Sequence, residues 1–233
     1  MIEIRDLTKI YGKQTVLNIP ELKIGKGESF GLVGNNGAGK TTMFRCVLDL
    51  IRPNSGTIFS KNNNVASTEI WKHYTGSYLD DNFLIDFLTP EEYFRFVADV
   101  YRLTAGDLEA FNQEFEDFFN NEILGKRKLI RNLSSGNRQK IGIAAALMPK
   151  PEILVLDEPF NNLDPSTQIR LKSILKFWQK EKEITMLISS HDLNHITDVC
   201  NRIVILHEGI MVHDLVTNPD TLKVLEEYFA IKN

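Results

Sequence analysis

The stretch of sequence that decides the fold is a glycine-rich segment of eight residues, Gly34-Asn35-Asn36-Gly37-Ala38-Gly39-Lys40-Thr41. It fits the pattern G-x-x-x-x-G-K-[ST], which connects a strand to a helix through a loop. An apolar run at residues 30–33 precedes the segment, and residues 42–50 after it have helical character. The segment therefore predicts a strand–loop–helix unit of an α/β fold.

The residue types in this segment suit a phosphate-binding loop, or P-loop. Glycines let successive backbone N–H groups turn inward on an anion, and the N-terminus of the following helix adds partial positive charge. Lys40 is expected to reach the terminal phosphates, and the Thr41 hydroxyl to ligate Mg²⁺. We expect residues 34–41 and Thr42 to bind a nucleoside triphosphate; the alternative is a glycine-rich turn without a ligand.

The apolar pattern outside the loop extends this prediction to the whole fold. Two further apolar runs, residues 153–156 and 184–188, have a helical pattern between them. Buried strands alternating with helices indicate a parallel sheet covered on both faces. The first thirty residues instead alternate apolar and polar positions, which predicts a small antiparallel β layer. The predicted fold is a P-loop NTPase core, a mostly parallel sheet flanked by helices, with an N-terminal antiparallel β layer.

The middle of the chain differs in composition, because half of its Phe and Tyr residues fall between positions 83 and 119. Thr89-Pro90-Glu91-Glu92 predicts a helix start, with Thr as N-cap and acids in the first turn. Aromatic residues then recur at helical spacing. We predict a helical subdomain at residues 83–149, inserted into a core of residues 1–82 and 150–233. Its aromatic residues form either a small core or a surface that docks another protein.

Composition and charge exclude several classes of protein. The chain has 233 residues, of which 42% are hydrophobic, and a net charge of −4. These values exclude a disordered chain, a collagen-like fibre and a disulfide-stapled miniprotein, and the acidic balance argues against a nucleic-acid partner. No apolar run reaches the length that crosses a bilayer, and the N-terminus lacks a secretory signal pattern, so the sequence predicts a cytoplasmic protein. Cys46 and Cys200 form no CxxC pair and are expected to be buried and reduced.

A pair of acids, Asp157 and Glu158, directly follows the apolar run at residues 153–156. In P-loop proteins an acid at the end of such a strand holds Mg²⁺, which is the role we expect for Asp157. Glu158 would then lie beside the γ-phosphate and polarise the attacking water as general base. The alternative is that both acids cap a solvent-facing strand end. Together with Lys40 and Thr41, the pair predicts hydrolysis of the bound triphosphate.

Four further features complete an ordered set, and with them the chain resembles the nucleotide-binding subunits of ATP-binding cassette (ABC) transporters over nearly its whole length. Tyr11 resembles the aromatic residue that stacks on adenine ahead of the P-loop. Residues 133–137, Leu-Ser-Ser-Gly-Asn, resemble the family's LSGGQ signature, and residues 161–164 take the place of the D-loop. His191 resembles the switch histidine that senses the γ-phosphate.

The resemblance implies an ATPase that uses ATP and Mg²⁺, with Lys40, Glu158 and His191 as catalytic residues. Ser134, Ser135 and Gly136 would bind the γ-phosphate of ATP held by a second subunit, because the helix that follows points its positive end there. This implies a head-to-tail homodimer, or a pair with a similar ATPase subunit. A separate transmembrane permease subunit would hold the chain at the cytoplasmic face of the membrane. The signature variant looks most like drug, lantibiotic or lipid exporter branches.

The chain also departs from the family pattern. Ser135 and Asn137 stand where the signature usually has glycine and glutamine. Where the family places the glutamine of the Q-loop, the chain reads Tyr78-Leu79-Asp80-Asp81, and we place Asp81 at the glutamine position. An acid there is expected to ligate Mg²⁺ or order water, with altered Mg²⁺ affinity or slower ATP hydrolysis as the consequence.

Two other functions fit parts of the pattern. A soluble ABC-type ATPase acting on the ribosome or in repair would usually carry twin cassettes, long coiled-coil insertions or iron–sulfur cysteines, and the sequence has none of these. A P-loop GTPase or small-molecule kinase explains neither the signature nor His191, and no N-K-x-D guanine-reading segment is present. A transport ATPase is therefore the leading hypothesis.

Overall fold

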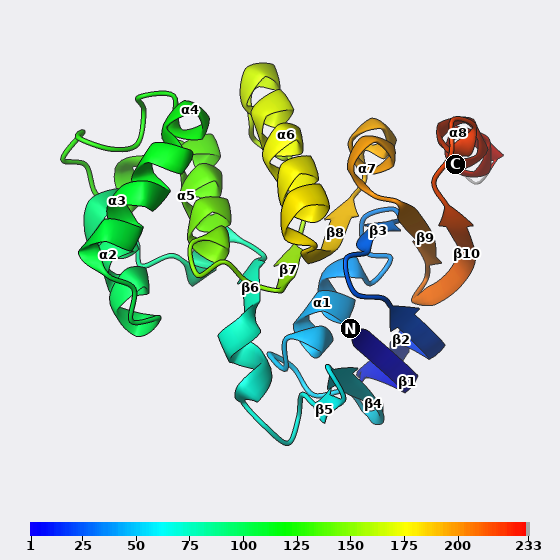
Figure 1. Cartoon of the computed structure of the whole chain (residues 1–233). Coiled ribbons are helices and arrows are strands. Elements are labelled where there is room, and N and C mark those ends of the chain that lie inside the picture. Colours follow the sequence, from blue (N-terminus) through cyan, green and yellow to red (C-terminus); the bar gives the residue numbers. More distant parts are fainter. Residues whose placement is uncertain (232–233) are drawn as a thin grey trace.

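A six-stranded sheet forms the centre of the protein in a computed structural model, which describes residues 1–231 (Figure 1). Five neighbouring strands are parallel, and only the edge strand β10 runs antiparallel to its neighbour β9. Their order across the sheet is β10 (Ile210–Val216), β9 (Arg202–His207), β3 (Ser29–Val33), β8 (Thr185–Ser190), β7 (Ile153–Leu156) and β6 (Thr75–Tyr78). The predicted α/β fold with a mostly parallel sheet is confirmed.

A second, antiparallel sheet is built largely from the first sixty residues, which confirms the predicted N-terminal β layer. Its strand order is β2 (Gln14–Ile24), β1 (Ile2–Tyr11), β4 (Ser55–Ser60) and β5 (Asn63–Asn64). Ile2, Ile4 and Leu7 of β1 are buried, while polar positions between them face outward. This half-buried pattern is what alternating apolar residues produce in a strand.

Helices lie on both faces of the central sheet, and two of them begin at an aspartate N-cap. The helices of the core are α1 (Lys40–Val47), α6 (Pro165–Lys182), α7 (Leu193–Val199) and α8 (Thr221–Ile231). Asp164 caps α6 by accepting from the Thr167 amide, and Asp192 caps α7 in the same way. Two single 3₁₀ turns, Ile70–Tyr74 and Asp81–Phe83, flank β6.

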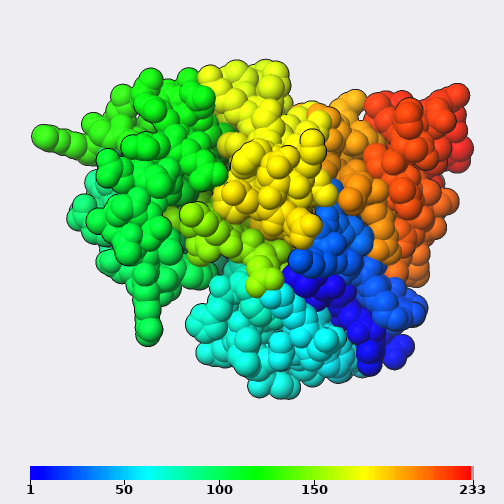
Figure 2. Space-filling view, viewed as in Figure 1, coloured from blue at the N-terminus to red at the C-terminus, as the bar shows by residue number. Residues whose placement is uncertain are grey.

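The predicted helical insertion is a lobe of four helices, which we call the helical lobe. It contains α2 (Pro90–Val100), α3 (Ala105–Glu114), α4 (Glu116–Phe119) and α5 (Ser135–Leu147), with a 3₁₀ turn at Ile130–Asn132 before α5. Figure 2 shows it in green at one end of the molecule, opposite the C-terminal elements. Thr89 and Thr104 start α2 and α3 with complete capping boxes.

Most aromatic residues of the helical lobe form its core, which favours that interpretation over a docking surface for them. Phe94, Phe111 and Phe119 are buried with ring centroids 5.2–6.3 Å apart, and Phe115 and Phe118 pack beside them. Three others, Phe83, Phe87 and Phe96, are exposed. The lobe therefore has its own apolar core and leaves a few aromatic side chains on its surface.

The central sheet is buried on both faces, and alternate residues of one strand belong to different cores. Leu154 and Leu156 of β7 pack into the core shared with the helical lobe, whereas Ile153 and Val155 pack into the core beneath the antiparallel sheet. This explains the continuous apolar run, since side chains of a strand alternate between faces. Within residues 1–231, no helix is long and apolar enough to span a membrane.

Candidate functional site

Three parallel strands bring the predicted site residues to one edge of the central sheet. The P-loop follows β3, the acid pair follows β7 and His191 follows β8. These strands are neighbours in the order β3-β8-β7, and their register aligns Val33 with Ser190 and Leu156 with Ile188. Carboxyl ends of parallel strands are the usual place for a ligand site in such sheets.

The P-loop closes tightly around the end of β3 because two of its glycines have backbone conformations that other residues rarely adopt. Gly37 and Gly39 have φ of 83° and 107°, and a Cβ at position 39 would lie 2.8 Å from the Val16 carbonyl oxygen. The Lys40 side chain is buried, and its Nζ donates to the Gly34 carbonyl oxygen at 2.6 Å. The same Nζ lies 3.5 Å from Glu158 Oε1. The cation is therefore held within the loop and next to the acid pair.

Asp157 joins the P-loop helix to β8, the strand that lies between β3 and β7. Its carboxylate accepts hydrogen bonds from the Thr41 hydroxyl on one oxygen and from the Ser189 hydroxyl on the other. Burial raises the pKa of the Asp157 carboxyl, and these two hydrogen bonds oppose the shift. A hydroxyl and a carboxylate side by side form an oxygen pair of the kind that holds Mg²⁺ in P-loop proteins.

The Glu158 side chain lies between a lysine and a histidine. Its Oε2 is 2.8 Å from His191 Nδ1 and accepts the His191 backbone N–H at 3.2 Å, while Oε1 faces Lys40. Glu158 also has a left-handed backbone, with φ of 48°, and its N–H donates to Ser189 Oγ at 2.9 Å. Strained backbone of this kind is concentrated at functional sites. The structure thus brings together Lys40, Thr41, Asp157, Glu158 and His191, as the sequence predicts.

Asp80 and Asp81 follow the end of β6 and have different partners. Asp81 accepts from the Tyr78 hydroxyl at 2.5 Å and from Arg138 Nε of α5 at 2.7 Å. Asp80 instead lies 3.4 Å from Arg45 Nη2 of α1, the helix that begins with Lys40 and Thr41. The expected Mg²⁺ contact of Asp81 stays a prediction, and the structure gives its carboxylate a cationic partner in the helical lobe.

The signature residues lie at the N-terminus of α5, away from the P-loop of the same chain. Ser134 is the N-cap and accepts from the Asn137 amide at 3.2 Å, and Ser134 and Ser135 are exposed. Gly136 packs against the D-loop, where a Cβ would lie 2.5 Å from the Asn162 carbonyl oxygen. Among residues 1–231, no hydrogen bond or ion pair joins these signature residues to the P-loop.

Tyr11 ends β1, at the hairpin that leads into β2. Its ring is half-exposed, 49%, and Lys9 Nζ lies 5.0 Å from the ring centroid. Adenine stacking on Tyr11 stays a prediction.

The structure adds two residues to the site that the sequence patterns do not predict, Ser189 and Gln139. Ser189 hydrogen-bonds both acids of the pair, and Gln139 Nε2 donates to the Glu158 carbonyl oxygen at 3.1 Å. Ser189 directly precedes Ser190 and His191 at the end of β8. Its position at the carboxyl end of a parallel strand could therefore have predicted that it lies in the site. Gln139 is far from the acid pair in sequence, and only the packing of α5 brings it near.

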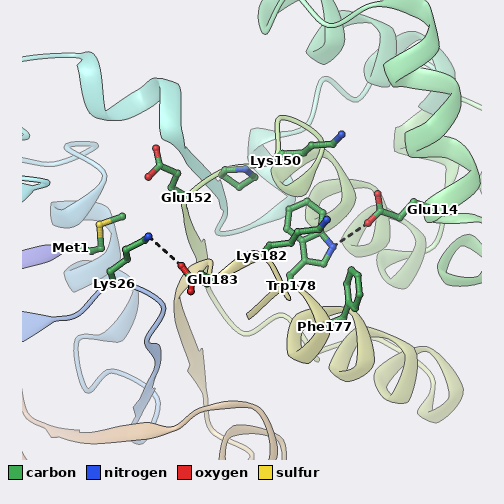
Figure 3. A pocket seen from close by; sticks show the side chains of 10 residues that line it. Met1, Lys26, Glu114, Lys150, Glu152, Phe177, Trp178, Lys182 and Glu183 are labelled. Carbon is green, nitrogen blue, oxygen red and sulfur yellow. Dashed lines mark hydrogen bonds and ion pairs between the residues drawn. The ribbon is translucent and has the colours of Figure 1, made fainter. Parts of the chain in front are cut away.

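A depression lies at the opposite edge of the sheet, at the amino ends of the strands, and is not part of this site (Figure 3). It has a volume of about 680 Å³ and lies near the amino ends of β7 and β8, with Phe177 and Trp178 of α6 on its wall. Each of its three carboxylates already has a partner: Glu114 accepts from the Trp178 indole, Glu183 pairs with Lys26, and Glu152 pairs with Lys61. None of the predicted site residues lines it.

The fold and the site define a P-loop nucleotide-binding protein with an inserted helical lobe. Comparison with known proteins gives the family. Residues 17–161 match the model of the ABC transporter family. The bacitracin transport ATP-binding protein of Enterococcus faecalis is 35% identical over 221 residues, which cover 92% of this chain and 69% of that protein. The lantibiotic transport ATP-binding protein of Streptococcus pyogenes is 30% identical over 231 residues, covering 98% and 96%.

Solved structures agree with this result. An ATP-binding subunit of an ABC transporter superposes with a TM-score of 0.83 at 28% identity, covering 97% of this chain and 93% of that one. A dimeric bacterial ABC transporter cassette has the same TM-score at 24% identity and shares the fold. The chain belongs to the ABC transporter family, as an ATP-binding subunit and ATPase.

Proposed function

We propose that this chain drives transport through a separate membrane subunit, by hydrolysing Mg²⁺-bound ATP between two subunits that close head to tail. The observation that carries the proposal is the position of Glu158 between Lys40 and His191, beside Asp157 and Thr41. This arrangement places a cation, an oxygen pair for a metal ion and a base within one site.

The roles of the residues follow from their chemistry. The P-loop amides and Lys40 would hold the β- and γ-phosphates, and Thr41 with Asp157 would hold Mg²⁺, which neutralises charge that develops on the phosphates. Glu158 would accept a proton from the attacking water as the water oxygen bonds to the γ-phosphorus. The bond from the γ-phosphorus to the bridging oxygen would break, and that oxygen would leave with ADP. His191 keeps one Glu158 oxygen in place through its ring and its backbone N–H. Tyr11 would stack on the adenine.

The exposed signature supports a site shared between two chains. Ser134 and Ser135 begin a helix of 13 residues, so amide groups and a partial positive charge point away from the chain at that end. A second copy, or a similar ATPase subunit, would place its bound ATP against this end. The P-loop of each chain would then be completed by the signature of the other.

The membrane subunit would bind a groove between the helical lobe and the core. The groove holds about 260 Å³ and is lined by residues including Leu50, Trp71, Leu79, Phe83 and Tyr101. Leu50 and Phe83 are about half exposed, and Phe87 nearby in the chain is 64% exposed. Exposed apolar side chains beside a groove are typical of a binding surface. We infer that this groove receives an apolar segment of the permease at the cytoplasmic face of the membrane.

The relatives suggest a class of cargo. The names of three of them specify bacitracin transport, lantibiotic transport and linearmycin resistance, each concerned with an antibacterial compound. We propose that the complete transporter moves an antibacterial compound of this kind out of the cell.

If two chains share each ATP site, the protein should dimerise when ATP is bound, and its molecular mass in solution tests this. In the Glu158→Gln background, Mg²⁺ and ATP should give a dimer on size-exclusion chromatography. Adding Ser134→Arg should leave a monomer that still binds a fluorescent ATP analogue through its P-loop, because the arginine blocks the signature of the partner. Ser67→Arg, an exposed serine outside the site, is the control and should dimerise. Dimers of the Ser134→Arg form would contradict the proposal.

A further inference from the structure

We propose that Tyr78 of β6 and Gln139 of the helical lobe are positioning residues that hold Glu158 in its active orientation. The inference rests on the proposed role of Glu158 as general base. It concerns a chain of hydrogen bonds that runs from Arg138 and Asp81 through Tyr78 and Gln139 to the Glu158 backbone.

The backbone of Glu158 needs support because its φ of 48° is costly for a residue with a Cβ. Three hydrogen bonds fix its backbone. The N–H donates to Ser189 Oγ at 2.9 Å, and the carbonyl oxygen accepts from the Asn161 amide at 3.2 Å and from Gln139 Nε2 at 3.1 Å. Of these, only the bond from Gln139 comes from the helical lobe. Rotation of this peptide would swing the carboxylate away from Lys40 and His191.

Gln139 can donate to Glu158 only if its amide is turned the right way, and Tyr78 sets that orientation. Gln139 is buried, and its Oε1 lies 3.3 Å from the Tyr78 hydroxyl. Burial and the hydrogen bond to Asp81 raise the pKa of Tyr78, so the hydroxyl keeps its proton. The Tyr78 hydroxyl oxygen lies 2.5 Å from Asp81 Oδ1, closer than its 3.3 Å to Gln139 Oε1, so Gln139 accepts the longer branch of a three-centre bond.

The ring of Tyr78 is itself held in place by a glycine in α5. A Cβ at position 142 would lie 2.0 Å from Tyr78 Cε2, so the ring rests directly on the helix backbone at Gly142. Gly142 is one turn beyond Gln139 on the same helix, which places the hydroxyl at the Gln139 amide. The backbone of Tyr78 also touches the site, because its carbonyl oxygen accepts from the Asp157 amide at 3.0 Å. Tyr78 thus joins α5, Asp81 and the acid pair.

The test separates this role from a structural one. Tyr78→Phe keeps the ring on Gly142 and removes the hydroxyl, and Gln139→Met keeps the length and removes the amide. Each should lower kcat for ATP hydrolysis about tenfold, since a small misplacement of a catalytic group is costly, while KM and the affinity for an ATP analogue change less than about twofold. Tyr93→Phe, which removes a hydroxyl inside the helical lobe, is the control and should match wild type.

A double variant shows whether Tyr78 acts through Glu158. In the Glu158→Gln background, Tyr78→Phe should not lower the residual single-turnover rate further, because the group that it positions is gone. An equal loss in both backgrounds, or a raised KM with unchanged kcat, would overturn the inference. If the Glu158→Gln variant hydrolyses ATP at the wild-type rate, Glu158 is not the general base. Suppose instead that Glu158→Gln loses turnover but Tyr78→Phe and Gln139→Met keep the wild-type kcat. That result would refute the positioning role and leave Glu158 as the base.

Discussion

Asp157 illustrates at the scale of one residue how a site is built at the expense of stability. Asp157 is only 6% exposed, and burial raises the pKa of its carboxyl above the ordinary value of 3.8. A raised pKa means that the charged form is less favourable in the folded chain than in the unfolded chain. The ionised carboxylate therefore destabilises the fold at neutral pH, where a bound metal ion would need it charged.

Replacing Asp157 with Asn should accordingly raise the melting temperature. Without nucleotide or Mg²⁺ at pH 7.5, we expect Tm to rise by a few degrees, and the gain should shrink toward pH 4 as wild-type Asp157 takes up its proton. Thermal unfolding across this pH range measures it. Asp198→Asn is a control of opposite sign, because a hydrogen bond from Lys176 lowers the pKa of Asp198 and its charge stabilises the fold. A lower Tm for Asp157→Asn at pH 7.5 would contradict this account.

Individual site residues were predictable where a motif fixes both type and position. The spacing from Gly34 to Thr41, and the acids after an apolar strand, predict that Lys40, Thr41, Asp157 and Glu158 lie together, and the structure brings them together. The partners of Asp81 were not predictable, because Arg138 is distant in the sequence and approaches only when α5 packs against the end of β6. Contacts between distant segments depend on packing that local patterns do not encode.

At the scale of elements, the helical lobe separates aromatic side chains that stabilise it from others that remain exposed. Phe94 of α2 is 1% exposed and stacks on Phe119 at 5.6 Å, whereas Phe83 is 50% exposed at the groove. The sequence pattern could not assign the two groups, since both belong to one aromatic-rich stretch. Their difference in burial predicts different consequences of the same substitution.

Phe94→Ala should lower the free energy of unfolding by about 3–5 kcal/mol, because it leaves a cavity in a packed core. Phe83→Ala should leave both Tm and ATP binding unchanged but reduce co-sedimentation of the chain with membranes that contain its permease, since it removes an exposed apolar contact. Thermal unfolding and a sedimentation assay measure the two effects. If Phe83→Ala co-sediments with these membranes as well as wild type does, the permease does not bind at Phe83.

Strand β6 marks the limit of prediction at this scale. Its residues, Thr75-Gly76-Ser77-Tyr78, lack the apolar run that identified the other parallel strands. The strand forms because it pairs with β7 in parallel. Position 76 needs glycine, since the Cβ of any other residue would lie 2.0 Å from the Ala146 carbonyl oxygen of α5. The apolar strands and the helix starts were predictable from local pattern, while this edge strand and the order of the sheet depended on tertiary contacts.

At the scale of the whole molecule, the chain carries two halves of an ATP site that do not meet within it. The P-loop and the acid pair lie at one edge of the sheet, and the signature begins α5 in the helical lobe. We propose that each half meets the complementary half of a second chain and that Glu158 accepts the proton of the attacking water. Hydrolysis should therefore depend on the Glu158 carboxylate, while ATP binding should not.

The most direct measurement is the fate of radiolabelled ATP on the Glu158→Gln protein. With Mg²⁺, we predict turnover at least about 100-fold below wild type, with unhydrolysed ATP retained at one molecule per chain. Glu152→Gln, at the opposite end of the same strand, is the control and should hydrolyse ATP like wild type. If the Glu158→Gln protein releases ADP at the wild-type rate, Glu158 is not the general base.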